Sequence, residues 1–169
     1  MNAWDITLRP WATTINIIFV GLVCVALNAC LLLIAGSFTA GPVLDLQLLY
    51  TPLEANQFLS VIGDVGRQRY LGLLLTIDLV FPAAYALLLS LLLIRVDPKQ
   101  QRSRLLWLPL AAAALDWAEN FGLVALLVTF HAEVPSNVAL FTMGCTLAKW
   151  MIVTVSLIAL LVGLLRTRN

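Results

Sequence analysis

The chain has 169 residues, of which 62% are hydrophobic and only 11% are charged, and its formal net charge is +1. Soluble domains usually carry about 25% charged residues, so this composition excludes an ordinary soluble domain and indicates an integral membrane protein. This net charge gives no argument for nucleic acid, and no basic patch with interleaved aromatic residues occurs in the chain, so we expect no nucleic-acid partner. Its three cysteines, Cys24, Cys30 and Cys145, form no Cys-x-x-Cys pair, and His131 is the single histidine. This inventory leads us to expect no metal ion and no cofactor.

Four apolar runs are long enough to cross a bilayer, which takes about 20 mostly apolar residues. They cover residues 12–36, 70–94, 105–130 and 138–165. The first run is longer than the core of a signal peptide, which has about 7–15 residues, so we interpret it as a retained helix. The sequence therefore predicts an all-α fold, with residues 1–169 forming a single domain built as an integral membrane four-helix bundle.

The loops predict the orientation of this bundle. Segment 95–104 is rich in lysine and arginine, and such segments stay in the cytoplasm. Both termini are then cytoplasmic, and loop 37–69 lies outside. We expect the bacterial inner (plasma) membrane. Within the loop, Thr51-Pro52-Leu53-Glu54 fits a helix capping box and predicts a short amphipathic helix, with Leu53, Phe58, Leu59 and Ile62 on the membrane surface. That helix is either a connector or a lid over a pocket.

Four ionisable residues, Asp78, Asp116, Glu119 and Lys149, fall inside the predicted spans. An ionisable group at this depth costs about 2.5–3.5 kcal/mol on insertion scales and usually has a partner or a function. A rise of about 1.5 Å per residue places all four at similar depth, together with Asn28 of the first span. We expect Lys149 to pair with a carboxylate, and Glu119 is the first candidate.

Spacing on the predicted helices supports a shared polar site. Asp116, Glu119 and Asn120 lie at i, i+3 and i+4, so they share one helical stripe. Pro82 lies four residues after Asp78 and frees the Asp78 carbonyl from its helical hydrogen bond. The candidate catalytic residues are Asp78, Asp116, Glu119 and Lys149. The candidate ligand-binding residues are Asn28, Tyr85, Asn120, Thr146 and Trp150, of which Tyr85 and Trp150 also fit a packing role.

Three functions remain open at this point. The acids could bind a membrane lipid or hydrophobic small molecule, or act on it by acid–base chemistry; whether the protein is an enzyme is left open. The chain could instead be a small proton-coupled carrier, which would require a homodimer. It could also be a non-catalytic subunit or assembly factor of a membrane complex, whose polar network fixes helix packing. The small bundle with carboxylates inside the membrane resembles the sterol-isomerase and sigma-2-receptor group in architecture, and this resemblance transfers no site residue.

Overall fold

The computed structural model describes residues 3–38, 40–97, 103–131 and 133–167. These residues form helices and no strand. The α-helices are α1 Ala3–Leu8, α2 Thr14–Ala35, α3 Pro52–Leu75, α4 Ile77–Arg95, α5 Trp107–Thr129 and α6 Ser136–Thr167. The short 3-10 turns are η1 Arg9–Trp11, η2 Leu44–Leu46 and η3 Ser103–Leu106.

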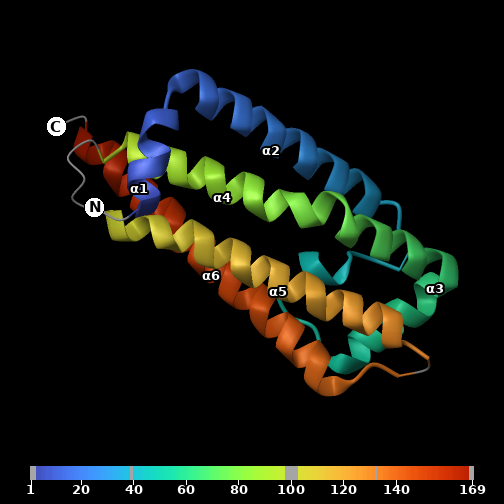
Figure 1. The fold of residues 1–169 in the computed structure, drawn as a ribbon. Coiled ribbons are helices and arrows are strands. Elements are labelled where there is room, and N and C mark those ends of the chain that lie inside the picture. The colour runs from blue at the N-terminus through green and yellow to red at the C-terminus, as the bar shows by residue number, and fades with distance from the viewer. Residues whose placement is uncertain (1–2, 39, 98–102, 132, 168–169) are drawn as a thin grey trace.

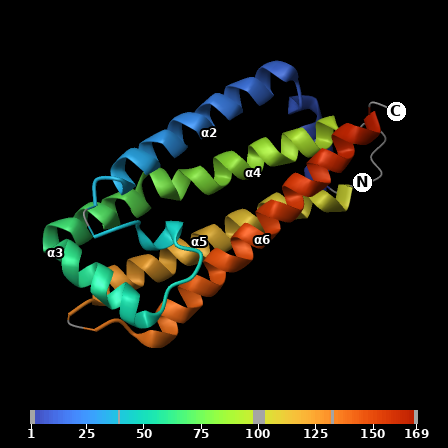
Figure 2. The same ribbon diagram turned by 180° about the vertical axis from the view of Figure 1, so that it is seen from behind.

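Four helical stretches are long and apolar enough to cross a membrane: Thr14–Ala35, Pro52–Arg95, Arg104–Thr129 and Ser136–Arg166. The all-α prediction with four apolar helices is therefore confirmed. Helices α2, α5 and α6 begin and end within two residues of the predicted runs. The long helices lie side by side, with α1 and the end of α6 at one end of the bundle (Figures 1 and 2). We call this the terminal end, and the opposite end, where α3 begins, the loop end.

The second span differs most from its prediction. Helix α3 starts at the expected capping box, because the Thr51 hydroxyl accepts from the Glu54 N–H and the Glu54 carboxylate accepts from the Thr51 N–H at 2.6 Å. The helix bends at Gly63 and continues to Leu75. It breaks at Thr76, directly before α4. The bend turns the first half of α3 against α5 and α6. Phe58 therefore packs in the core with Tyr70, not on a membrane surface.

Gly63 has φ 63° and ψ −175°, a backbone conformation that is essentially confined to glycine. Gly63→Ala is expected to destabilise the protein by about 1–3 kcal/mol, because a side chain strains this bend. The measurement is thermal unfolding in mild detergent, followed by circular dichroism. Gly72→Ala is the matched control in the same helix, since an added Cβ there meets nothing within 4 Å. Equal melting temperatures for the two variants would contradict the role of the bend.

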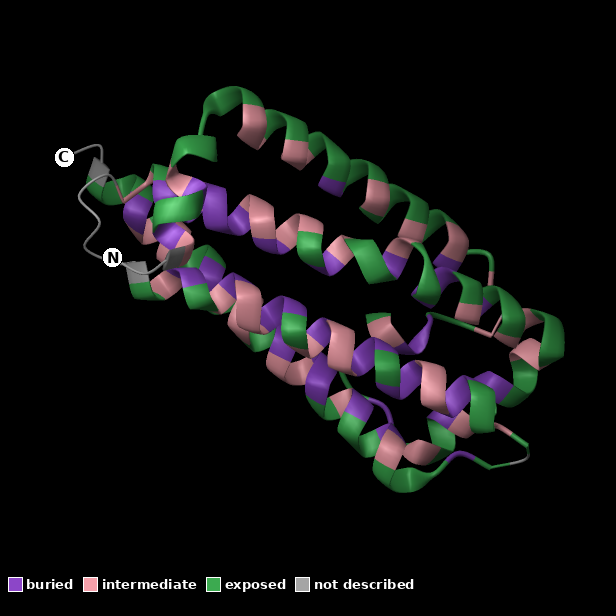
Figure 3. Ribbon diagram, in the orientation of Figure 1, coloured by how far each residue is buried: buried purple, intermediate pink, exposed green. Residues whose placement is uncertain are grey.

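Packing is uneven among the long helices. Helix α5 packs closely against α6 and also contacts α4, whereas α2 packs mainly against α4. Figure 3 shows the consequence, because most of α2 is exposed or half-buried while buried residues follow the facing sides of α4 and α5. The interior of the bundle is therefore formed chiefly by α3, α4, α5 and α6.

The loop between α2 and α3 enters the bundle. Its residues Val43, Leu44 and Tyr50 are buried, and η2 contacts α5. Figures 1 and 2 both show the short cyan turn of η2 beside the middle of α5. The loop thus carries Asp45 to the level of the charged residues on α5, and it is more than a surface connector.

Candidate functional site

Lys149 joins α6 to α5 through two ion pairs. Its Nζ lies 2.5 Å from Glu119 Oε2 and 3.0 Å from Asp116 Oδ1. All three side chains are buried, with Glu119 0% exposed. The predicted pair of Lys149 with Glu119 is confirmed, and Asp116 shares the same ammonium group. The arrangement follows from the stripe on α5, since residues three apart on a helix face the same neighbour.

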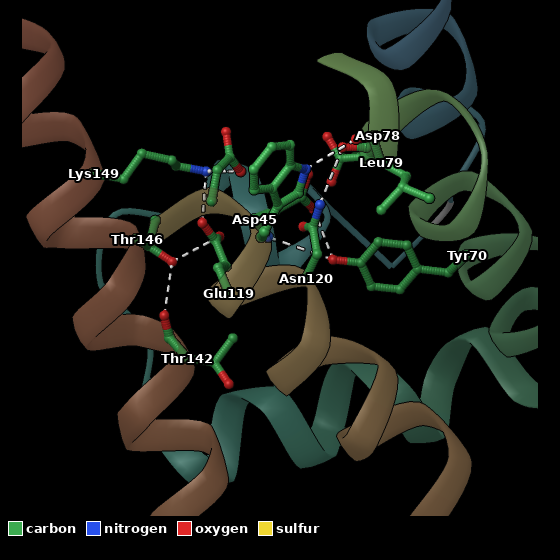
Figure 4. Close-up of polar contacts among 11 residues, drawn as sticks. Asp45, Tyr70, Asp78, Leu79, Glu119, Asn120, Thr142, Thr146 and Lys149 are labelled. Atoms are coloured by element: carbon green, nitrogen blue, oxygen red, sulfur yellow. Dashed lines mark hydrogen bonds and ion pairs between the residues drawn. The ribbon is translucent and has the colours of Figure 1, made fainter. Parts of the chain in front are cut away.

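The second oxygen of Glu119 is also held by α6. The Thr146 hydroxyl donates to Glu119 Oε1 at 2.7 Å (Figure 4). Helices α5 and α6 approach closely here because Gly122 has no side chain; a Cβ at this position would collide with the Thr142 hydroxyl. Glu119 therefore has protein partners on both carboxylate oxygens, and its position is fixed by α6.

Helix α5 holds the start of α4 through main-chain oxygens. Pro82 has no N–H to offer the Asp78 carbonyl, and Asn120 Nδ2 donates to that carbonyl at 3.1 Å instead. One residue further along α4, the Leu79 carbonyl accepts from Trp117 Nε1 at 2.9 Å. The proline break in the α4 hydrogen-bond ladder is thus repaired by a neighbouring helix.

Two acceptor atoms beside these bonds lack a partner. Asp78 and Asn120 are 5% and 4% exposed, yet Asp78 Oδ2 and Asn120 Oδ1 form no hydrogen bond with any residue that the structure describes. The Tyr85 hydroxyl is likewise buried and lies near Asp116 without a hydrogen bond of normal geometry. Because buried polar atoms are nearly always hydrogen-bonded, Asp78 Oδ2 and Asn120 Oδ1 are candidates to accept a hydrogen bond from another molecule.

Sequence analysis missed Asp45 and Tyr70. The Tyr70 hydroxyl donates to Asp45 Oδ1 at 2.7 Å, and its ring packs edge-on against Phe38 and Phe58. Burial raises the pKa of the Asp45 carboxyl, while the Tyr70 hydrogen bond and the charge of Lys149 act in the opposite direction. The sequence signal that could have indicated the burial of Asp45 was its apolar neighbours Val43, Leu44 and Leu46, which are unusual in a water-exposed loop.

We define the polar cluster as Asp45, Asp78, Asp116, Glu119, Asn120 and Lys149. Figure 4 shows the labelled members converging from α4, α5, α6 and the η2 segment. Within the cluster, Lys149 lies 3.0 Å from Asp116 and 2.5 Å from Glu119. With four acids and one lysine, the cluster has an excess of hydrogen-bond acceptors inside the bundle.

Two candidate residues are exposed on the surface of the bundle. Asn28 is exposed on α2, and Trp150 is 45% exposed on α6. The predicted depth of Asn28 along the helix carries no information about the direction in which its side chain points. Helix α2 is apolar on all sides, so its sequence does not predict which of its faces points into the bundle. His131, which we did not count as a site residue, is exposed in the turn after α5.

Within the described ranges, no three His, Cys, Asp or Glu side chains come together as metal ligands. Comparison of the chain with protein-family models, curated proteins and solved structures gives no match. The class of protein that the fold and site define is a membrane-type helix bundle with a buried cluster of charged residues.

Proposed function

We propose that the protein binds a hydrophobic or amphiphilic small molecule from the membrane at the polar cluster. The observation that carries this proposal is the pair of buried, unpartnered acceptors, Asp78 Oδ2 and Asn120 Oδ1. An unsatisfied buried acceptor costs about 1–3 kcal/mol, and a network used only to clamp helices would have no reason to keep two. A donor group on a ligand would satisfy both.

The chemistry of these atoms indicates the kind of ligand. Asn120 Nδ2 already donates to the Asp78 carbonyl, so the amide orientation is fixed and its free atom is the acceptor oxygen. A carboxylate oxygen and an amide oxygen both accept hydrogen bonds. The proposed ligand therefore carries a hydroxyl or amine donor on an apolar body, and the body stays among the helices or in lipid.

The same arrangement would support acid–base chemistry on that ligand. Glu119 and Asp116 are tied to Lys149, whereas Asp78 has no cation within ion-pair distance among the described residues. Unlike environments separate the proton affinities of neighbouring acids, which acid–base catalysis requires. In this proposal Asp78 exchanges a proton with the ligand donor, Tyr85 and Asp116 lie beside it, and Glu119 with Thr146 positions Lys149.

The proposal includes a single domain in the bacterial inner membrane, with both termini cytoplasmic.

The proposal predicts a ligand that depends on Asp78 and Asn120. Native mass spectrometry from mild detergent should show a discrete bound mass on the wild-type protein. Asp78→Asn and Asn120→Ala should each weaken its retention by roughly tenfold or more, because each removes an acceptor. Asn28→Ala is the matched control, since Asn28 lies on the exposed side of α2, and it should keep the bound mass.

Circular dichroism of each variant would show that its fold survives. Absence of any bound mass from the wild type, or equal retention by Asn120→Ala and Asn28→Ala, would contradict the proposal. It would then favour the second candidate, a non-catalytic subunit of a membrane complex. The exposed amide of Asn28 favours this alternative, because a polar side chain on an otherwise apolar helix suits a contact with another membrane helix. A co-purifying protein that is lost in Asn28→Ala would support it.

A further inference from the structure

A surface groove lies between α2 and α3, apart from the polar cluster. Its lining is apolar at Leu33, Ile34, Gly72 and Leu73 and polar at Ser37, Arg69 and Thr76. Both helices that form it belong to stretches long and apolar enough to cross a membrane. Helix α2 ends at Ala35, so the groove lies near the loop end of an apolar span. In a bilayer, this level is close to the boundary between acyl chains and headgroups.

The apolar part of the groove is open to a flexible chain. Leu33 is 77% exposed, and Gly72 is exposed in the facing helix. A Cβ added at Gly72 would meet nothing within 4 Å, so the space above this residue is free of protein. An acyl chain could therefore lie along Leu33 and Gly72, in contact with the protein on both sides.

The polar part of the groove carries one uncompensated cation. Arg69 is exposed and forms no ion pair with any residue that the structure describes. By contrast, its neighbour Arg67 already has several partners. Arg67 pairs with Asp64 and donates to the Leu59 carbonyl at 2.7 Å. Its guanidinium also lies 4.7 Å from the Phe130 ring centre. Arg69 is thus the arginine of this pair that is available for an outside anion.

The two hydroxyls of the groove do not donate hydrogen bonds to that anion. Ser37 donates to the Ile34 carbonyl and Thr76 donates to the Gly72 carbonyl, each at 2.6 Å. Their protons are therefore committed to the helices, and their oxygens remain as acceptors. A ligand that suits the groove has an apolar chain, an anionic group for the guanidinium and a hydroxyl that can donate to these oxygens.

We propose that this groove is a binding site for an anionic phospholipid with a hydroxylated headgroup. The phosphate contacts Arg69, because a guanidinium matches phosphate with two parallel hydrogen bonds. One acyl chain lies against Leu33 and Leu73, and the headgroup hydroxyl donates to Ser37 or Thr76. The lipid would occupy the leaflet on the loop side, where it would fill the space between the end of α2 and α3.

Native mass spectrometry with added lipids tests this site. The probes are palmitoyl-oleoyl-phosphatidylglycerol and palmitoyl-oleoyl-glycerol, which has the same chains without a phosphate. The wild type should bind one phosphatidylglycerol preferentially. Arg69→Gln should weaken that binding by roughly tenfold, and Arg69→Lys should recover part of it. Gly72→Leu should weaken binding of both lipids, because the new side chain fills the groove.

Arg166→Gln is the matched control, since Arg166 is exposed on α6 at the terminal end of the bundle. It should leave preferential binding unchanged. An equal effect of Arg69→Gln and Arg166→Gln would show a general electrostatic attraction and overturn the site, as would an unchanged affinity in Arg69→Gln. The result is separable from the ligand of the polar cluster, because Asp78→Asn should not alter phosphatidylglycerol binding.

Discussion

Lys149→Met is expected to destabilise the protein by about 3–5 kcal/mol, the range found when one partner of a buried ion pair is removed. The substitution leaves Asp116 and Glu119 buried on one stripe of α5 without the ammonium group that lies within 3.0 Å of both. Two like charges at such a depth repel and lack solvent. The measurement is the melting temperature in mild detergent, together with the loss of helical circular dichroism.

A neutral version of the network provides the control. The triple variant Asp116→Asn, Glu119→Gln and Lys149→Met removes the lone acids along with the lysine. It should recover most of the stability lost in Lys149→Met, because a buried ion pair adds little net stability once no charge is left unpaired. If Lys149→Met were as stable as the wild type, the lysine would not be compensating these acids. If the triple variant were no better than the single one, unpaired charge would not be the cause of the lost stability.

Tyr70→Ala is expected to cost about 3–5 kcal/mol, as for other large aromatic side chains truncated in protein interiors. Tyr70 is 0% exposed, and its ring centre lies 5.8 Å from that of Phe38 and 5.9 Å from that of Phe58. The substitution leaves a cavity and also removes the hydrogen bond to Asp45. Thermal unfolding should show the loss, and hydrogen–deuterium exchange should show faster exchange over residues 43–47.

Tyr70→Phe separates the two contributions. It keeps the ring packing and removes only the hydroxyl, so the loss of stability should be smaller, about 1–3 kcal/mol. The pKa of the Asp45 carboxyl should rise further, because the hydrogen bond from Tyr70 lowers it in the wild type. Faster exchange should be confined to residues 43–47. Exchange there at the wild-type rate would mean that this hydrogen bond does not hold the η2 segment in the bundle.

Much of the architecture could be predicted from local sequence. The apolar runs gave α2, α5 and α6 to within two residues, because the length and hydropathy of a spanning helix are set by the bilayer. Side-chain spacing on α5 also identified Asp116, Glu119 and Asn120 as one stripe. The pairing of Glu119 with Lys149 followed from charge, since a lysine at this depth needs a carboxylate partner.

The remaining features depend on contacts between distant segments. The bend at Gly63 is decided by how the first half of α3 packs against α5 and α6, and a glycine alone predicts no direction. Asp45 accepts a hydrogen bond inside the bundle from Tyr70, which lies 25 residues further along the chain. The exposure of Asn28 could not be predicted, because the apolar surroundings of α2 define no inward face. Helix rotation in lipid is set by neighbouring helices.

The hydrogen bonds from Asn120 and Trp117 to α4 are made to main-chain atoms of that helix and do not involve its side chains. Helix α5 recognises the carbonyls of Asp78 and Leu79, which every amino acid possesses. These two hydrogen bonds between α5 and α4 therefore do not depend on the side chains at positions 78 and 79. Asp78 could be exchanged for a different functional group without undoing the contact. The chemistry of the site and the assembly of the bundle can thus diverge independently, one residue at a time.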